Sequence, residues 1–306
     1  MSKSAMLTCY DISSDSERLS RVDNFCEEIK TVILNSESVA ARIRYLSDLK
    51  EEGESQFVSN FKICNEGLFC SFLHMENGSG INISKTLLNA KEFDLEEATA
   101  ETAVNITGHI KESTYFFMTD KYLILKNTRT ISKDDIAIYL NYLLENMTEK
   151  YRGKSHPLFL KYHIKKSFDV TQIKSFELLD GYKINKDSII STVSKSISLD
   201  SIFSAVDMNG LSVDDVLSAS IVFKIRKMPK DKKVESAKIA QAIFDGFNTD
   251  NVKFMGKNHT PLSVTDAKTT KAISLKFSNN SRYPDKDSLR QNMIDFVKEV
   301  ENESDS

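Results

Sequence analysis

Apolar side chains recur at helical spacing over the first 50 residues of the chain. The spacing predicts two helices, over residues 15–35 and 39–49, whose outer faces are mostly acidic. We therefore assign residues 1–55 to an N-terminal helical segment. The apolar positions of the first helix are Leu19, Val22, Phe25, Cys26, Ile29 and Ile33.

From residue 57 the apolar pattern changes to one typical of strands. Residues 57–64 and 68–74 flank Asn65-Glu66-Gly67, and this arrangement predicts a hairpin with a three-residue loop. Two short apolar runs on either side of Thr119-Asp120-Lys121 predict a second hairpin.

Two helix starts in the same region carry capping residues. Asp94 is followed three residues later by Glu97, and Ser132 is followed by Asp135 at the same interval. Both pairs fit the capping box, in which the two residues satisfy each other's backbone N–H groups. We therefore predict an α+β domain over residues 56–150.

The second half opens with residues 151–157, where Gly, Pro and polar residues predict a linker. Short helices are expected over residues 198–217. Three strand-like segments follow, and a helix is predicted between the first two of them. The strands are expected at residues 219–227, 251–255 and 272–277, and the helix at residues 232–247.

These elements predict an α+β fold as a whole. It has N-terminal helices, small antiparallel hairpins with helices, and a C-terminal mixed sheet covered by a helix on one face. The C-terminal sheet belongs to a predicted basic domain over residues 158–298. Residues 299–306 are predicted to be an acidic, frayed tail.

Alternation along the three late strands separates apolar from basic positions. Ile221, Phe223 and Ile225 fall on one face of the first strand, and Lys224 and Arg226 fall on the other. The other two strands repeat this alternation. If the three strands share a sheet, its uncovered side collects Lys224, Arg226, Lys253 and Lys276.

Charge is distributed unevenly between the two halves. Residues 1–150 hold 16 Lys and Arg against 24 Asp and Glu, a balance of −8, whereas residues 151–306 hold 25 against 20, a balance of +5. Within the second half, residues 219–282 hold 13 basic and 5 acidic side chains, a local excess of +8. Such an asymmetry indicates a polyanionic partner.

Further lysines gather where the predicted helix begins, and its dipole already presents positive charge there. A bound phosphate would offset this repulsion. A second basic cluster lies beside Tyr162 and His163 and extends the same track. The candidate contacts at the helix start are Lys227, Lys230, Lys232 and Lys233, and those of the second cluster are Lys161, Lys165 and Lys166.

Lysine outnumbers arginine in this region, which favours phosphate contacts over bidentate reading of bases. The chain has no Trp and no aromatic RNA-recognition motif. The residues therefore favour duplex DNA held by its backbone. The alternative is that these lysines form only the solvated surface of an α+β domain.

Composition and motifs exclude several other classes. With 40% hydrophobic and 28% charged residues among 306, and only 4 Pro, the chain is globular. No nucleotide-binding, zinc-protease or serine-hydrolase motif occurs, so we predict no enzymatic activity, no cofactor and no metal. The four cysteines are interpreted as reduced thiols, and the absence of an apolar leader predicts a cytoplasmic protein.

Six segments in order give the chain a family resemblance. They are the Asn65-Glu66-Gly67 hairpin, LLNAKEFDLEEA, YFFMTDKYLILK, SKDDIAIYLNYLL, IVFKIRKMPKDKKVESAKIAQAIF and VKFMGKNHTPLSVTDAKTTKAI. Over residues 55–275, and most closely over residues 221–240, this order resembles the RexA family of prophage superinfection-exclusion and abortive-infection proteins. The resemblance implies a DNA-binding homodimer that senses infection and signals to a separate membrane protein.

Two other functions stay open. One is a metal-dependent antiphage nuclease, for which Glu28-Ile29-Lys30 matches a short nuclease pattern but lies in a helical stretch. The other is a defence component that binds protein rather than nucleic acid, through the acidic helices of residues 15–52. In that case the basic surface has no ligand.

Overall fold

The fold is mixed α+β and rich in sheet. The backbone divides into two compact units, residues 1–163 with 270–306, and residues 164–269. Each unit is described by itself. The computed structural model describes residues 3–14, 24–46, 54–76, 81–100, 106–154, 156–165, 175–178, 221–224, 252–255, 261–262, 267–277 and 283–305.

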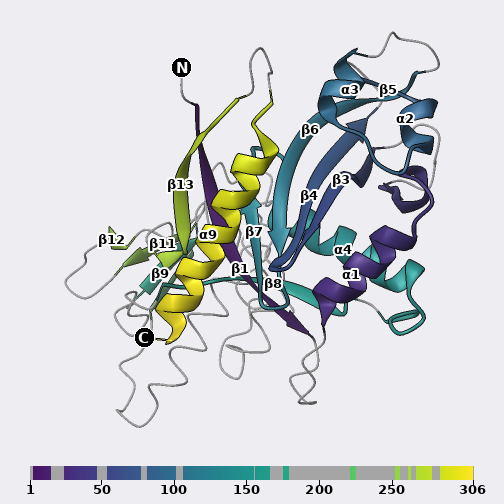
Figure 1. Ribbon diagram of the computed structural model, residues 1–306. Coiled ribbons are helices and arrows are strands. Elements are labelled where there is room, and N and C mark those ends of the chain that lie inside the picture. The colour runs from purple at the N-terminus through teal and green to yellow at the C-terminus, as the bar shows by residue number, and fades with distance from the viewer. Residues whose placement is uncertain are drawn as a thin grey trace, which may run out of the picture. The chain divides into compact units, whose positions relative to one another are not determined.

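A nine-stranded antiparallel sheet forms the first unit, with the path β13-β1-β7-β6-β4-β3-β2 (Figure 1). In addition, β5 pairs with β6, and β8 pairs with β1 beyond the end of β13. The strands are β1 (Lys3–Ser14), β2 (Arg44–Tyr45), β3 (Ser55–Cys64), β4 (Gly67–Glu76), β5 (Ile81–Ser84), β6 (Ile106–Met118), β7 (Tyr122–Lys126), β8 (Leu158–Tyr162) and β13 (Thr270–Leu275).

Helices cover both faces of this sheet. Figure 1 shows α9 lying across the front of β1 and β7. Beneath α9, Leu7, Ile124 and Ile273 are buried in one apolar cluster. On the opposite face Phe72 packs against Tyr139 of α4, with ring centroids 5.1 Å apart. The helices are α1 (Phe25–Asn35), the 3-10 helix η1 (Ala40–Arg42), α2 (Lys85–Asn89), α3 (Leu95–Ala100), α4 (Lys133–Met147) and α9 (Lys286–Asp305).

A fully buried arginine joins several of these elements. The Arg42 guanidinium donates to the Val58 carbonyl (2.7 Å), the Ser36 hydroxyl (2.8 Å) and the Lys91 carbonyl (2.7 Å). The Tyr139 hydroxyl accepts a hydrogen bond from the Val58 N–H and donates one to the Arg42 carbonyl, each at 3.0 Å. The end of α1, η1, β3 and α4 therefore meet at one polar point inside an apolar layer.

The second unit contains a smaller antiparallel sheet in the order β10-β9-β11-β12. Its strands are β9 (Ser175–Leu178), β10 (Ile221–Lys224), β11 (Val252–Met255) and β12 (Pro261–Leu262). The helices predicted over residues 198–217 and 232–247 lie outside the described residues.

Both predicted hairpins and the capping box at Ser132 are confirmed, and one of the two capping hydrogen bonds predicted at Asp94 is present. The β3–β4 loop is one residue shorter than predicted, because Cys64 pairs with Gly67 and only Asn65-Glu66 remain in the turn. At the start of α4, Ser132 Oγ accepts from the Asp135 N–H at 3.2 Å, and the Asp135 carboxylate accepts from the Ser132 N–H at 2.8 Å. At α3, the Asp94 N–H donates to Glu97 at 3.1 Å.

The all-helical prediction for residues 1–55 is wrong in two places. Residues 3–14 form β1, which lies next to the edge strand β13, and the described residues 39–46 contain η1 and β2 rather than an α-helix. In β1 the alternate side chains of Leu7 and Cys9 are buried under α9. Contacts with residues far along the chain therefore decide this conformation, and local spacing does not reveal them.

Two C-terminal predictions also differ from the structure. The third late strand, β13, pairs with β1 in the large sheet and does not share a sheet with β10 and β11. The predicted frayed tail is the last part of α9, which continues to Asp305, and Val300 within it is 1% exposed.

The cysteines are free thiols. Strand alternation puts Cys64 and Cys70 on opposite faces of the β3–β4 hairpin, because Cys64 pairs with Gly67 and Cys70 with Phe61. They therefore cannot meet within the hairpin. Burial raises the pKa of Cys26 to about 12, and it raises the pKa values of Cys9 and Cys70 as well.

Gly67 should not tolerate a larger side chain. A Cβ at this position would lie 2.3 Å from the Met118 carbonyl oxygen across the β4–β6 pair. We expect Gly67→Ala to lower the free energy of unfolding by about 1–3 kcal/mol, the usual cost of overpacking, as measured by urea unfolding. Gly153→Asn is the control, because Gly153 has a φ of 75° that Asn accepts and no atom lies within 4 Å of its Cβ position. An unfolding midpoint for Gly67→Ala equal to that of the control would contradict the packing.

The buried thiols should make the protein sensitive to alkaline pH. The pKa of Cys26 is raised from 9.0 to about 12 in the folded state, so its contribution to stability is complete below about pH 9 and is lost as pH rises towards 12. We expect the free energy of unfolding to fall above pH 9 by up to about 1.4 kcal/mol per pH unit for this thiol. Urea unfolding of the parent and of Cys26→Ser at pH 8, 9 and 10 measures how the free energy of unfolding of each protein changes with pH. Equal slopes for the two proteins would disprove it.

Candidate nucleic-acid interface

The small sheet of the second unit contains two of the predicted contact residues. Residues directly opposite each other in antiparallel strands share a face. Across β10, β9 and β11, Lys224 lies opposite Ser175, and Val222 and Lys253 both lie opposite Glu177. The backbone positions of Lys224 and Lys253 therefore share one face of this sheet.

The arrangement separates the two lysine positions by one intervening strand. Lys224 is on β10 and Lys253 is on β11, and the register offsets them by two residues along β9, so their backbones are about 12 Å apart. On the same face, Glu177 of β9 lies directly opposite Lys253, and Ser175 lies directly opposite Lys224. The sequence analysis did not predict β9. Its SFEL segment alternates apolar and polar residues, but four residues are too few to identify a strand.

Of the remaining candidates, Lys161, Lys165 and Lys276 are described, and none of the three belongs to a strand of this sheet. Lys165 belongs to the second unit, where its backbone N–H donates to Ala267 at 2.9 Å. Lys161 and Lys276 belong to the first unit: Lys161 lies opposite Asp11 in the β1–β8 pair, and Lys276 is exposed directly after β13. Lys166, Arg226, Lys227, Lys230, Lys232 and Lys233 lie outside the described residues.

An acidic group accompanies the cluster around Lys161. The imidazole of His163 lies 2.7 Å from Asp11, measured from Nδ1 to Oδ1, and it meets the ring of Tyr122 edge-on. Asp11 thus lies beside both basic side chains of this region. The positive charge predicted for this cluster is partly compensated within the first unit.

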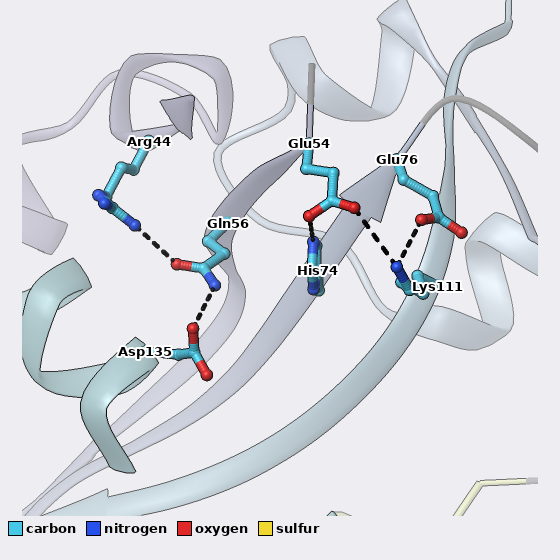
Figure 2. Close-up of polar contacts among 7 residues, drawn as sticks. All are labelled: Arg44, Glu54, Gln56, His74, Glu76, Lys111 and Asp135. Carbon is cyan, nitrogen blue, oxygen red and sulfur yellow. Dashed lines mark hydrogen bonds and ion pairs between the residues drawn. The ribbon is translucent and has the colours of Figure 1, made fainter. Parts of the chain in front are cut away.

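Sequence reasoning missed a charged clasp in the first unit, formed by Glu54, His74, Glu76 and Lys111 (Figure 2). One Glu54 carboxylate oxygen lies 3.1 Å from His74 Nε2, and the other lies 3.4 Å from Lys111 Nζ. Lys111 also pairs with Glu76 at 2.7 Å, and hydrogen bonding to Glu76 raises the pKa of Lys111. The clasp joins β4 and β6 to the residue that precedes β3.

A neutral amide continues this polar region towards α4 (Figure 2). Gln56 accepts a hydrogen bond from Arg44 at 3.0 Å and donates one to Asp135 at 3.1 Å. Asp135 also caps α4, so the bridge fixes β2 and β3 against the start of that helix. Burial lowers the pKa of Arg44.

The charged clasp stabilises the fold. The Lys111 amine neutralises two carboxylates that would otherwise repel each other across the ends of β3 and β4. In the described part of the chain, no group of three or more His, Cys, Asp and Glu side chains is placed to hold a metal ion. Among the described helices, none is long and apolar enough to cross a lipid bilayer.

No protein-family model matches the chain, and no curated protein matches it significantly.

Removing the central amine of the clasp should weaken the fold in a salt-dependent way. In Lys111→Met, Glu54 and Glu76 lose their shared cation, so we expect a lower urea midpoint at low ionic strength and a smaller loss in 1 M salt. Lys62→Met is the matched control, because Lys62 is an exposed lysine on β3 with no ion pair among the described residues. Equal midpoints for the two variants at both ionic strengths would show that the clasp contributes nothing.

Proposed function

We propose that this chain binds duplex DNA through the phosphate backbone, without sequence specificity, and acts as a cytoplasmic sensor in antiphage abortive infection. The observation that carries the proposal is the shared face of Lys224 and Lys253, which lie on two different strands of one sheet. Lysines on one face of a sheet suit contact with phosphates on a nucleic-acid backbone, and Glu177 is the one acidic residue that the described strands add to this face.

The charge of the region supports a polyanionic ligand. Residues 219–282 carry an excess of +8 in a chain whose net charge is −3. Cations gathered against the overall sign of a protein attract phosphate locally. Lysine predominates, and its flexible ammonium group neutralises phosphate without reading the bases. The proposed binding is therefore independent of sequence and strongly dependent on salt.

The biological part of the proposal rests on the resemblance to the RexA family. It places the chain in superinfection exclusion by a prophage, as a homodimer that passes its signal to a separate membrane protein. The order of segments over residues 55–275 supports both of these partners.

Fluorescence anisotropy with a 30-base-pair duplex over a salt series tests the DNA proposal. If six cations engage phosphates, log K should fall against log salt with a slope of about −5, at about 0.9 per phosphate. Lys224→Glu combined with Arg226→Glu should weaken binding at least tenfold at 0.1 M salt and make the slope shallower. Binding should weaken because two phosphate contacts are lost and two new carboxylates repel the DNA.

A matched control separates local contact from net charge. Lys62→Glu combined with Lys121→Glu changes the net charge by the same amount, at two exposed lysines of the first unit. This control should bind within about threefold of the parent, and circular dichroism checks that each variant is folded. No binding by the parent, or equal losses in the two double variants, would reject the proposal.

A further inference from the structure

One part of the large sheet is covered on one side only. Along β1 and β13, Leu7 and Ile273 are 0% and 5% exposed beneath α9. The alternate residues point the other way and are exposed, and Met6 among them is 40% exposed. We call this surface the open face, and in Figure 1 it is the side of β1 and β13 turned away from α9. Its members are Ser4, Met6, Ala272 and Ser274.

The residues of the open face are small or uncharged. The β1–β13 register pairs Ser4 with Ser274 and Met6 with Ala272, so two exposed hydroxyls lie side by side. Asn127, which follows β7, lies next to them, because its N–H donates to the Met6 carbonyl at 2.9 Å. The surface thus offers hydroxyl groups with no bulky side chain between them.

Asn127 adds further hydrogen-bond donors. Its side-chain oxygen accepts a bond from the Thr8 hydroxyl at 2.9 Å, and this bond orients the amide. The amide nitrogen therefore keeps both of its N–H groups for another acceptor. Asn127 itself is exposed.

Two exposed cations lie close in sequence to the open face and to Asn127. Lys276 continues the alternation of Ala272 and Ser274, and Arg129 follows Asn127 by two residues. Both are exposed, and neither side chain forms an ion pair with a described residue. The carboxylate beside Arg129, that of Glu112, is already held by the backbone N–H groups of Arg129 and Thr130 at 3.4 and 2.9 Å.

We propose that the open face, with Asn127, Arg129 and Lys276, is a second phosphate-contact surface for a nucleic-acid backbone. Hydroxyl, amide, guanidinium and ammonium groups all donate hydrogen bonds, and phosphate oxygens accept them. None of the four residues of the open face is a carboxylate, and the Glu112 carboxylate beside Arg129 already accepts hydrogen bonds from two backbone N–H groups. The inference rests on the proposed DNA binding, and it assigns Lys276 to this face of the first unit instead of the small sheet of the second unit.

Charge complementarity favours a nucleic acid over a protein strand or helix at this surface. Protein interfaces have an apolar core, and among the four residues of the open face only Met6 is a large apolar side chain. Interfaces with nucleic acids are polar and positively charged. The small side chains also let a sugar–phosphate backbone approach the sheet closely.

Lys276→Glu combined with Arg129→Glu tests the surface with the same 30-base-pair duplex. We expect binding at least tenfold weaker at 0.1 M salt, and a salt slope shallower by about 2, since two phosphate contacts are lost. The control is again Lys62→Glu combined with Lys121→Glu, whose binding should stay within about threefold of the parent. Parent-like binding by Lys276→Glu with Arg129→Glu, while Lys224→Glu with Arg226→Glu is weakened, overturns this inference alone. No binding by the parent overturns the proposed function and this inference together.

Photo-crosslinking supplies a readout that does not depend on removing charge. In a Cys64→Ser chain, Ser274→Cys carries a benzophenone at the centre of the open face, and Lys62→Cys carries the same group on β3 as the control. We expect crosslinks to the duplex from position 274 and none above background from position 62. Equal yields from both positions, or none from position 274 under conditions in which the parent binds DNA, would reject the open face as a contact surface.

Discussion

Arg42 has no carboxylate partner, although its side chain is fully buried. A buried charge costs several kcal/mol unless hydrogen bonds compensate it, and here two carbonyls and a hydroxyl accept three of the five guanidinium N–H groups. Burial lowers the pKa of Arg42, yet an arginine remains charged in a protein interior. The hydrogen bonds therefore hold the end of α1, η1, β3 and the segment before α3 in one geometry. Packing of the apolar layer around them can follow only once these groups are satisfied.

The position of Arg42 explains how one edge of the sheet is closed. The β3–β4 register shifts between Val58 and Asn60, and β2 pairs with β3 only at Ser55 and Gln56. Beyond that point the Val58 N–H and carbonyl would face the edge without a strand partner. Tyr139 and Arg42 bond to these two groups, and the Phe93 N–H bonds to the Ser59 carbonyl at 2.9 Å. Side chains thus protect this edge, as natural sheets require.

Sequence patterns predicted the elements that are held together by residues close to one another in the sequence. The two hairpins and the Ser132–Asp135 cap involve residues three to twenty positions apart, and each could be predicted from its own segment. In contrast, β1 is a strand because β7, β8 and β13 pair with it, and these strands are distant in the sequence. The helical pattern assigned to residues 1–55 could not include such pairing. For the same reason the sequence pattern predicted the wrong sheet for β13, which pairs with the distant strand β1.

The candidate DNA contacts also differ in whether local sequence or long-range strand pairing determines their position. Alternation in the sequence predicted that Lys224 and Lys253 fall on corresponding faces, and the β10–β9–β11 register agrees with it. Lys276 shows the same alternation, but only the pairing of β13 with β1 reveals which surface it joins. The charged clasp was missed because a bulge at His74 and Met75 shifts the register and brings Lys111 between two carboxylates. A single extra residue in β6 changes which side chains meet, and no pattern in the sequence marks it.

The uneven distribution of charge is compatible with a polyanionic ligand despite a net charge of −3. Exposed charges further apart than about 8–10 Å are largely screened at physiological salt. Much of the acid in the described first unit is also already engaged: Glu54 and Glu76 bind Lys111, and Asp135 caps α4. These carboxylates satisfy partners inside the fold, whereas Lys276 and Arg129 have no ionic partner among the described residues. The local sign of a surface, rather than the sum over the chain, therefore determines where a phosphate backbone can lie.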